Sequence, residues 1–477
     1  MASTRQAVFK VMPGAAPDIM RDYDLATLGY EEKEYSFEGT ATSYELQGER
    51  GADGHWDAAP AGEAPFRTRF VARWPSDPLQ FSGTVVVEWH NVSAGIDAAP
   101  EGGFFHRSLT AAGHAWVGVS AQKVGIDGGG FVESIHLKLL APERYGDLEH
   151  PGDAWSFDIF TQVGALLQLP SDENPLAGLR PSQILAAGES QSAACLVTYI
   201  NAVDPHAQLF GGYFVHGRPA SGVSIDGVFI PASQRLGMEA TRTAISSRGE
   251  RIRDDARVPV LVLQSETDVV LLGGQLAEQP DSDRLRVWEM AGTAHADTYT
   301  VSAGRHDDGT LSAERMAELL RPTTDLMIGR TDTPINAGPQ QHYVAQAALA
   351  HLQRWAAGGQ APPSAPSLQL NADRTDYVLD EHGIAQGGIR TPWVDEPTAV
   401  LGGLGQTGET FAMLFGRSEP FDEATLSALY PGGKDEYLER FAGSLDAAIA
   451  AGFLLEQDRM EILAVAAHSY PLRLADG

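Results

Sequence analysis

Cysteine is almost absent from this chain, because Cys195 is the only one among 477 residues. A single thiol cannot form an intramolecular disulfide, so nothing in the sequence calls for an oxidising compartment. Zinc clusters built on several cysteines are excluded for the same reason. Cys195 lies in an apolar run, and we expect it to be a buried core residue because a free thiol packs like a small hydrophobic group.

Long hydrophobic runs are missing as well. No stretch reaches the roughly 18 apolar residues that a membrane-spanning helix needs. The first residues, Met1–Gly14, lack the long apolar core of a signal peptide. These two absences lead us to expect a soluble cytoplasmic protein with no membrane partner, although the removal of a leader would leave the same sequence.

Basic residues are scarce relative to acidic ones. The chain has 34 Lys and Arg against 63 Asp and Glu, which gives a net charge of −29. A surface of this charge repels phosphate groups, which argues against nucleic acid and anionic membranes as partners. We therefore expect the partner to be a small molecule.

The sequence does contain a series of strand-like segments. Two early segments alternate polar and apolar residues, which is typical of antiparallel strands with an exposed face, at residues 35–46 and 65–73. Later segments are apolar on both faces, which is typical of buried parallel strands. These later segments span residues 84–89, 115–121, 183–187, 209–215, 260–263 and 286–290.

Helical segments alternate with several of these strands, at residues 104–112, 154–169 and 191–202. This alternation predicts an α/β fold with an eight-stranded, mostly parallel sheet and helices on both faces.

The chain continues well beyond the last of these strands. We expect residues 1–310 to form the core, with residues 221–256 as an insertion and candidate lid. Residues 311–477 would form either a small second domain or an extension that packs on the core, and the second reading is favoured because this part lacks an independent core pattern. A helix over 340–357 would join the core, and residues 421–429 and 436–451 read as further helices.

The segment Ile184–Ala194 carries the clearest chemical pattern. A buried strand runs into Gly188-Glu189-Ser190-Gln191-Ser192, and a helix of small residues follows. This context is typical of a nucleophile elbow, a sharp turn that exposes the serine Oγ above the sheet. The pattern predicts Ser190 as the nucleophile, although Ser192 stands where glycine is usual. The alternative is a serine-rich turn that caps a helix.

A serine hydroxyl needs a base, and the base needs an acid that orients it. Enzymes built on such an elbow place the acid and then the histidine later in the chain. Here one strand is followed by Glu266 and Asp268, and the next strand is followed by His295. The sequence therefore predicts a catalytic triad of Ser190, Asp268 and His295. Glu266 stays as the alternative acid, because only the spacing Ser265-x-x-Asp268 resembles the usual Gly-x-x-Asp turn.

The oxyanion hole is predicted from two loops. The turn after the nucleophile aims the backbone N–H of Gln191 at a developing oxyanion. A second donor is expected after the strand at 84–89, from the N–H of Asn91 or Val92. The alternative for Asn91 is that its side chain fixes this loop by hydrogen bonds.

Two residues near the predicted triad, Trp89 and His216, are candidates for the substrate pocket. Both lie at the end of a predicted strand, where ligand sites of α/β sheets gather. Core packing is the alternative, and for an aromatic residue such as Trp89 it is the favoured one.

Several segments together carry a resemblance to a known family. The chain resembles a branch of the α/β-hydrolases that is named only after its hydrolase domain, and the likeness extends from about residue 35 to about residue 465. The matching segments are Gly83–Ser93, Trp116–Gly125, Tyr145–Asp153, Ala187–Ala193, Thr198–Ala202 and Gly387–Pro392. The resemblance implies the α/β-hydrolase fold and a serine-dependent hydrolase, usually an esterase. Serine at position 192 looks normal within this branch.

These observations predict a serine-dependent carboxylic-ester hydrolase that acts through an acyl-enzyme on a small or medium ester, without a metal or an organic cofactor. Lactonase, thioesterase and acyltransferase activities with the same residues are alternatives, and so is a non-catalytic binding protein of the same fold. The sequence leaves the physiological substrate and the oligomeric state open.

Overall fold

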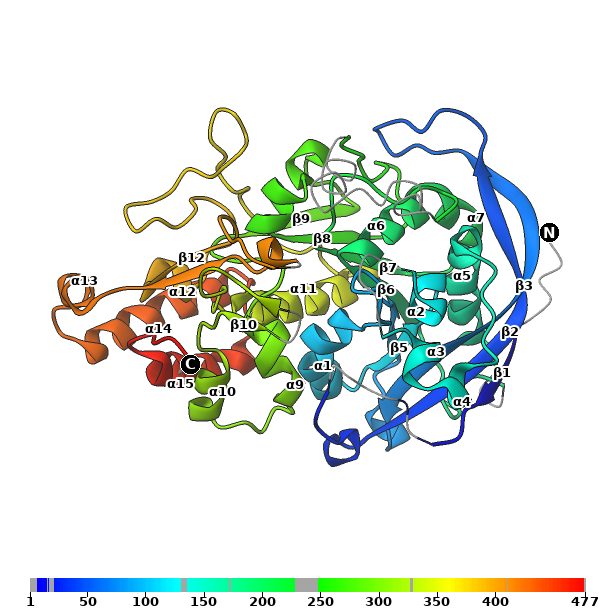
Figure 1. The fold of residues 1–477 in the computed structure, drawn as a ribbon, viewed down its shortest axis with the longest axis horizontal. Coiled ribbons are helices and arrows are strands. Elements are labelled where there is room, and N and C mark those ends of the chain that lie inside the picture. Colours follow the sequence, from blue (N-terminus) through cyan, green and yellow to red (C-terminus); the bar gives the residue numbers. More distant parts are fainter. Residues whose placement is uncertain are drawn as a thin grey trace.

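The computed structural model describes residues 7–14, 16, 21–129, 135–170, 173–227, 248–326, 329–409 and 411–475. Within these residues a nine-stranded sheet runs through the molecule in the order β1-β2-β3-β5-β4-β6-β7-β8-β9 (Figure 1). Strand β2 (Tyr30–Leu46) pairs antiparallel with both β1 (Val8–Val11) and β3 (Ala58–Pro75), and β3 is also antiparallel to β5.

The remaining strands are all parallel. They are β4 (Thr84–Trp89), β5 (Ala115–Val119), β6 (Gln183–Glu189), β7 (Gly212–His216), β8 (Val260–Ser265) and β9 (Leu285–Met290). The predicted fold class, a mostly parallel sheet with helices, is confirmed. The sheet has one strand more than predicted, because the largely exposed β1 carries no buried apolar pattern and is defined only by its pairing with β2.

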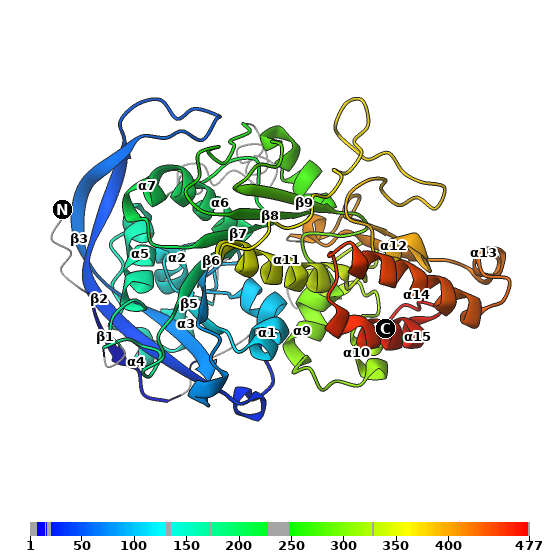
Figure 2. The same ribbon diagram turned by 180° about the vertical axis from the view of Figure 1, so that it is seen from behind.

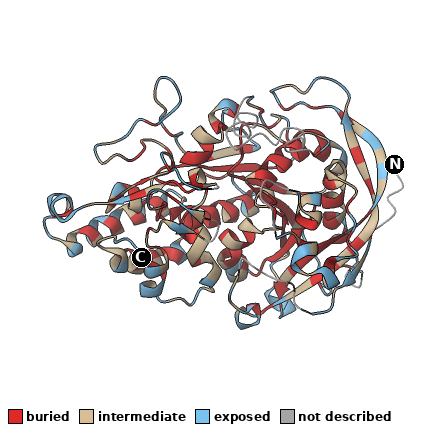
Figure 3. Ribbon diagram, in the orientation of Figure 1, coloured by how far each residue is buried: buried red, intermediate tan, exposed pale blue. Residues whose placement is uncertain are grey.

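Successive side chains of the parallel strands pack on opposite faces of the sheet, as the period of two requires. On one face, Val87 and Val215 pack with the helices α5 (Ser156–Leu166) and α6 (Gln191–Thr198). On the other face, Val86 and Phe214 pack with α1 (Pro100–Ala112) and α11 (Gln340–Ala356), and Figure 2 shows α11 running beside the sheet. The strands of the parallel sheet and the helices that cover its two faces are largely buried (Figure 3).

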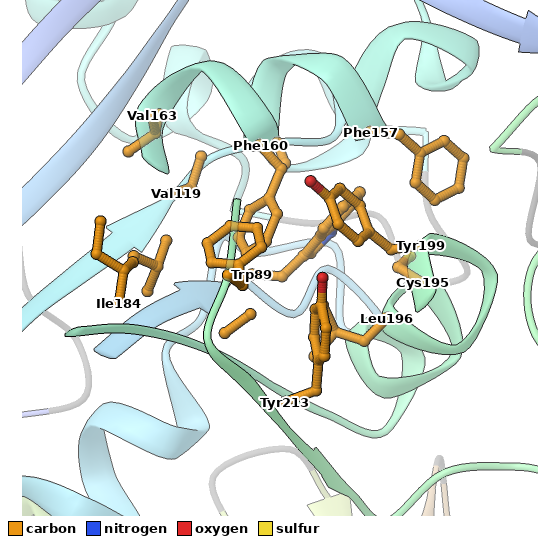
Figure 4. Close-up of a cluster of buried hydrophobic side chains, with 14 of the residues drawn as sticks. Trp89, Val119, Phe157, Phe160, Val163, Ile184, Cys195, Leu196, Tyr199 and Tyr213 are labelled. Atoms are coloured by element: carbon orange, nitrogen blue, oxygen red, sulfur yellow. The ribbon is translucent and has the colours of Figure 1, made fainter. Parts of the chain in front are cut away.

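Trp89 belongs to the core on the α5 and α6 side (Figure 4). Its ring centroid lies 5.6 Å from that of Phe157 and 4.9 Å from that of Phe160. Its indole N–H donates to Oε1 of Gln122 over 3.1 Å, so the polar tip of the ring is also satisfied inside the protein. Trp89 therefore packs in the core, which is the alternative that the sequence analysis favours for it. Cys195 lies in the same cluster and is buried, as predicted.

The chain after β9 packs on the same face of the sheet as α1. Helix α11 contacts α1, β7 and β8, while α14 (Lys434–Ala450) and α15 (Arg459–Ser469) place Phe441 and Ile462 in the same hydrophobic cluster. Residues beyond 311 thus share one core with the sheet (Figure 2). Within the described residues, no helix has both the length and the apolar character needed to cross a lipid bilayer.

Short elements complete the fold. The helices are α2 (Lys123–Asp127), α3 (Leu137–Leu140), α4 (Pro142–Tyr145), α7 (Asp204–Ala207), α9 (Gly304–His306), α10 (Ala313–Leu319), α12 (Pro392–Asp395) and α13 (Glu423–Leu429). Two small antiparallel pairs join β10 (Asp325–Leu326) to β11 (Gly329–Arg330) and β12 (Ala399–Gly402) to β13 (Arg417–Pro420). Of the candidate lid at 221–256, residues 228–247 lie outside the described part of the chain.

Candidate active site

The turn between β6 and α6 holds Ser190 in an unusual backbone conformation, with φ 58° and ψ −117°. A side chain at positive φ is strained, and such strain is typical of a nucleophile elbow. Glycine is favoured at position 188, because a Cβ there would lie a tight 3.0 Å from the backbone of Ser192. The Ser192 hydroxyl donates to the Glu189 carbonyl over 2.8 Å, so this serine closes the turn where glycine is usual.

The structure brings Ser190 together with the predicted base and acid. Nε2 of His295 lies 2.9 Å from Oγ of Ser190, and Nδ1 of the same ring lies 2.5 Å from Oδ1 of Asp268. The second oxygen of Asp268 accepts hydrogen bonds from the backbone N–H and the hydroxyl of Ser265, at 2.7 and 2.8 Å. The three side chains therefore form a continuous hydrogen-bonded chain at the carboxyl ends of β6, β8 and β9.

Glu266, the alternative acid, has a different role in the structure. Its carboxylate accepts the N–H of Gly292 over 2.6 Å and the N–H of Gly403 over 2.7 Å, and burial raises its pKa to about 7. It thereby ties the loop that carries His295 to the C-terminal part of the chain. Asp268 is the residue that contacts the imidazole.

Further contacts from the C-terminal part of the chain hold the His295 loop. The side-chain amide of Gln341, on α11, donates to the carbonyl of His295 over 3.3 Å. The amide of Asn336 donates to the carbonyl of Gly292 over 3.0 Å, and the N–H of Ala296 donates to the carbonyl of Leu414 over 3.0 Å. Residues beyond 311 therefore contribute to the position of the imidazole.

The oxyanion-hole candidates differ in how free their N–H groups are. Gln191 is the first residue of α6, where no preceding helical carbonyl can accept its N–H. The N–H of Val92 faces the Oε1 atom of Gln191 at a long 3.5 Å. The N–H of Asn91 already donates to the carbonyl of Ala98 over 2.8 Å, so its assignment as an oxyanion donor is wrong.

Asn91 instead fixes the loop through its side chain, as the alternative interpretation has it. Its Nδ2 atom donates to the carbonyl and to Oε2 of Glu189, at 3.0 and 3.1 Å. Its Oδ1 accepts the N–H of Ser93 over 2.8 Å. This amide joins the loop after β4 to the residue that precedes Ser190.

His216 lies behind the elbow. Its carbonyl accepts the N–H of Ser190 over 2.8 Å, and its ring packs at right angles against Phe214 and close to Phe104, with 1% of the residue exposed. Burial lowers the pKa of His216 to about 4, so the ring is neutral. The ring therefore packs in the protein interior, as the alternative interpretation has it.

Glu189 is the residue of this site that the sequence analysis missed. Its Oε1 atom lies 3.0 Å from Nε2 of His295, the nitrogen that also faces Ser190. Burial raises the pKa of Glu189 to about 7, against the opposing effect of the imidazole. Burial alone would lower the pKa of His295, but the carboxylates of Glu189 and Asp268 raise it to about 9. Because the elbow pattern accepts any residue before the serine, no local signal marks Glu189.

Among the described residues, one group of metal-ligating side chains lies close together, formed by His55, Asp254 and Asp255. All three are exposed, and the two carboxylates face opposite ring nitrogens of His55, at 2.8 and 3.7 Å. Arg253 also binds Asp255, so this group forms part of a polar cluster on the surface.

The sequence matches the model of the family described as the alpha/beta hydrolase domain over residues 4–464. The chain belongs to this family. A search of curated protein sequences gave no match.

Three solved esterase structures are similar to the chain at low identity. The esterase Est22 is 12% identical to this chain. The alignment covers 57% of this chain and 75% of the Est22 chain, with a TM-score of 0.31. Acetyl xylan esterase 1 from Thermoanaerobacterium sp. is 10% identical, covers 59% and 80%, with a TM-score of 0.29. The glucuronoyl esterase from Solibacter usitatus is 11% identical, covers 61% and 82%, with a TM-score of 0.29.

Proposed function

We propose that this α/β-hydrolase family member is a serine-dependent carboxylic-ester hydrolase that acts through an acyl-enzyme. The observation that carries the proposal is the hydrogen-bonded chain from Oγ of Ser190 through the His295 imidazole to the Asp268 carboxylate. Family membership supports a hydrolase, and a free serine hydroxyl would be too weak a nucleophile without the adjacent base.

In the proposed reaction the Ser190 oxygen attacks the ester carbonyl while Nε2 of His295 takes its proton. Asp268 holds the ring in the tautomer that presents a lone pair at Nε2, and it stabilises the imidazolium that forms. The protonated ring then gives its proton to the leaving alcohol. Water attacks the acyl-enzyme with His295 again as base, which releases the acid and restores the serine.

The tetrahedral intermediate carries a negative oxygen that needs hydrogen-bond donors. The backbone N–H of Gln191 and the N–H of Val92 are the two donors proposed for it, because both border the elbow and neither has a close backbone acceptor. One such donor is worth about 2.7–4 kcal/mol of barrier stabilisation in serine hydrolases.

The test combines a fluorophosphonate probe with a panel of p-nitrophenyl esters of increasing acyl length. We expect the wild-type protein to be labelled and to hydrolyse at least one short or medium ester. The Ser190→Ala variant should lose both the label and the hydrolysis, while Ser427→Ala, at an exposed position of α13, should keep them. Labelling that persists in Ser190→Ala, or a wild-type protein that neither labels nor hydrolyses, would contradict the proposal.

A further inference from the structure

The catalytic imidazole has more partners than the proposed mechanism uses. Nε2 of His295 lies 2.9 Å from Oγ of Ser190 and 3.0 Å from Oε1 of Glu189, so one ring nitrogen faces both a hydroxyl and a carboxylate. On the opposite side, Nδ1 lies 2.5 Å from Oδ1 of Asp268. The ring is thus placed between two carboxylates.

Glu189 is fixed in this position by its surroundings. The last residue of β6 is immobilised by the sheet, and Asn91 binds its second carboxylate oxygen over 3.1 Å. The Glu189 residue is 8% exposed, so solvent screens its interaction with the ring only weakly. The contact is therefore built into the fold and does not depend on a mobile surface side chain.

The contact has a consequence for the protonation state of the ring. A neutral ring with its proton on Nδ1 would turn a lone pair toward an ionised Glu189, and two electron-rich atoms at 3.0 Å repel each other. An imidazolium instead presents an N–H that both Ser190 Oγ and the Glu189 carboxylate can accept. The arrangement favours the charged ring.

Other titratable groups around the pair do not cancel this effect. On β7, His216 is neutral because burial lowers its pKa to about 4, and on α1 burial raises the pKa of Glu101 well above its usual range. After β9, burial raises the pKa of Asp297 to about 6, and its carboxylate accepts hydrogen bonds from Thr300. Asp268 adds to the effect of Glu189, since both carboxylates raise the pKa of His295.

We propose that Glu189 is a positioning residue for the catalytic base: its carboxylate accepts the Nε2–H of the His295 imidazolium beside Ser190 and stabilises the charged ring. This inference rests on the proposed function. Before each turnover the imidazolium loses its Nε2 proton to solvent, and the neutral ring then takes the Ser190 proton during attack. Glu189 accepts the regenerated Nε2–H and so stabilises the ring in the transition state.

The sign of the pH dependence follows from the state that reacts. Only the neutral ring can act as base, so kcat/KM rises as the pH rises through the pKa of His295, which lies at about 9 in the wild-type protein. The substitution Glu189→Gln removes the negative charge and keeps the shape. It lowers the pKa of His295, so the acidic limb moves to lower pH by about one unit or more. The plateau falls about threefold or more, because a less basic ring is a weaker general base.

The experiment measures two pH profiles from about pH 5 to about pH 10.5. One is kcat/KM for a p-nitrophenyl ester, and the other is the rate of inactivation by a fluorophosphonate, which depends on the serine and its base alone. Glu289→Gln is the matched control. Glu289 is also buried with a pKa raised to about 7 by burial, but its carboxylate accepts the N–H of Leu368 and does not contact the imidazole.

We expect the acidic limb of Glu189→Gln to move in both profiles and that of Glu289→Gln to coincide with the wild type. A Glu189→Gln variant that loses rate with an unmoved limb would overturn the inference, because the residue would then be only structural. Labelling that persists in Ser190→Ala would instead overturn the proposed function, so the two failures are distinguishable.

A measurement on the wild-type protein needs no variant at residue 189. In ¹⁵N spectra of histidine-labelled protein at about pH 7.5, we expect both ring nitrogens of His295 to be protonated, because this pH lies well below the pKa of His295, about 9. The His295 signals are identified by their loss in His295→Gln. An unprotonated Nε2 under these conditions would overturn the inference even if Glu189→Gln failed to fold.

Discussion

Two carboxylates follow the same strand, and the structure gives them different partners. Asp268 contacts the imidazole and is held by Ser265, whereas Glu266 binds the backbone N–H groups of Gly292 and Gly403. The two residues are two positions apart in the chain, and the loop that each side chain contacts decides which of them orients the imidazole. The two residues can therefore be separated by experiment.

Replacing Asp268 by Asn should lower kcat by roughly 10⁴-fold, the size of the loss when the acid of a Ser-His-Asp triad no longer fixes the tautomer. Glu266→Gln should retain far more activity and instead lower the midpoint of thermal unfolding, because an amide cannot accept both N–H groups as well as a carboxylate. Steady-state kinetics and thermal unfolding of both variants check this. A Glu266 variant with the larger kinetic loss would reassign the acid.

At the scale of elements, the long β2–β3 hairpin extends past the other strands (Figure 1), and its loop contacts residues 222, 223, 248 and 250. The Arg50 guanidinium donates to the carbonyls of Gly222 and Val223, each over 2.8 Å. It also binds the carboxylate of Glu250, which is 3% exposed. A single side chain thus joins the segment before 228 to the segment after 247.

Replacing Arg50 by Ala should destabilise the protein by about 3 kcal/mol, because it leaves the buried Glu250 carboxylate without its ion-pair partner. Cleavage by a low dose of protease should increase at the segments on either side of 228–247. The control on the same hairpin is Arg67→Ala, whose partner Glu38 is 41% exposed, and which should cost less than about 1 kcal/mol. Equal losses of stability in the two variants would contradict the role given to Arg50.

At the scale of the whole molecule, the C-terminal part completes the core. On the face of the sheet toward α11, Phe214, Leu261 and Trp288 are fully buried, and α11 belongs to the same hydrophobic cluster. The same part of the chain supplies contacts to the His295 loop through Gln341 and Asn336. The sheet and the later helices should therefore fold as one unit.

A chain ended after residue 310 should fail to give a soluble monomer, because it would expose the apolar face that α11 covers. Size-exclusion chromatography and the binding of a hydrophobic dye check this expectation. The control lacks only residues 472–477. These residues follow α15, so their removal leaves every helix of the described structure in place. A monomeric, natively folded 1–310 fragment would show that the C-terminal part is an independent domain.

Much of the fold and of the candidate site could be predicted because the signals are local. Apolar runs between turn residues predicted β4 to β9, and the strand-turn-helix pattern singled out Ser190. The order of serine, acid and histidine then predicted the residues that the structure brings within hydrogen-bond reach. β1 escaped prediction because a short edge strand is defined by its partner more than by its own residues.

The sequence by itself determined which segments form the parallel strands and the helices α1, α5, α6 and α11, because hydrophobic periodicity is a property of neighbouring residues. Only the tertiary structure decided that Trp89 faces the core, that the N–H of Asn91 is already bonded, and that Glu189 meets the catalytic imidazole. Each of these depends on atoms from elements far apart in the chain, and the side chain at the end of a strand takes its role from the partners that folding places beside it.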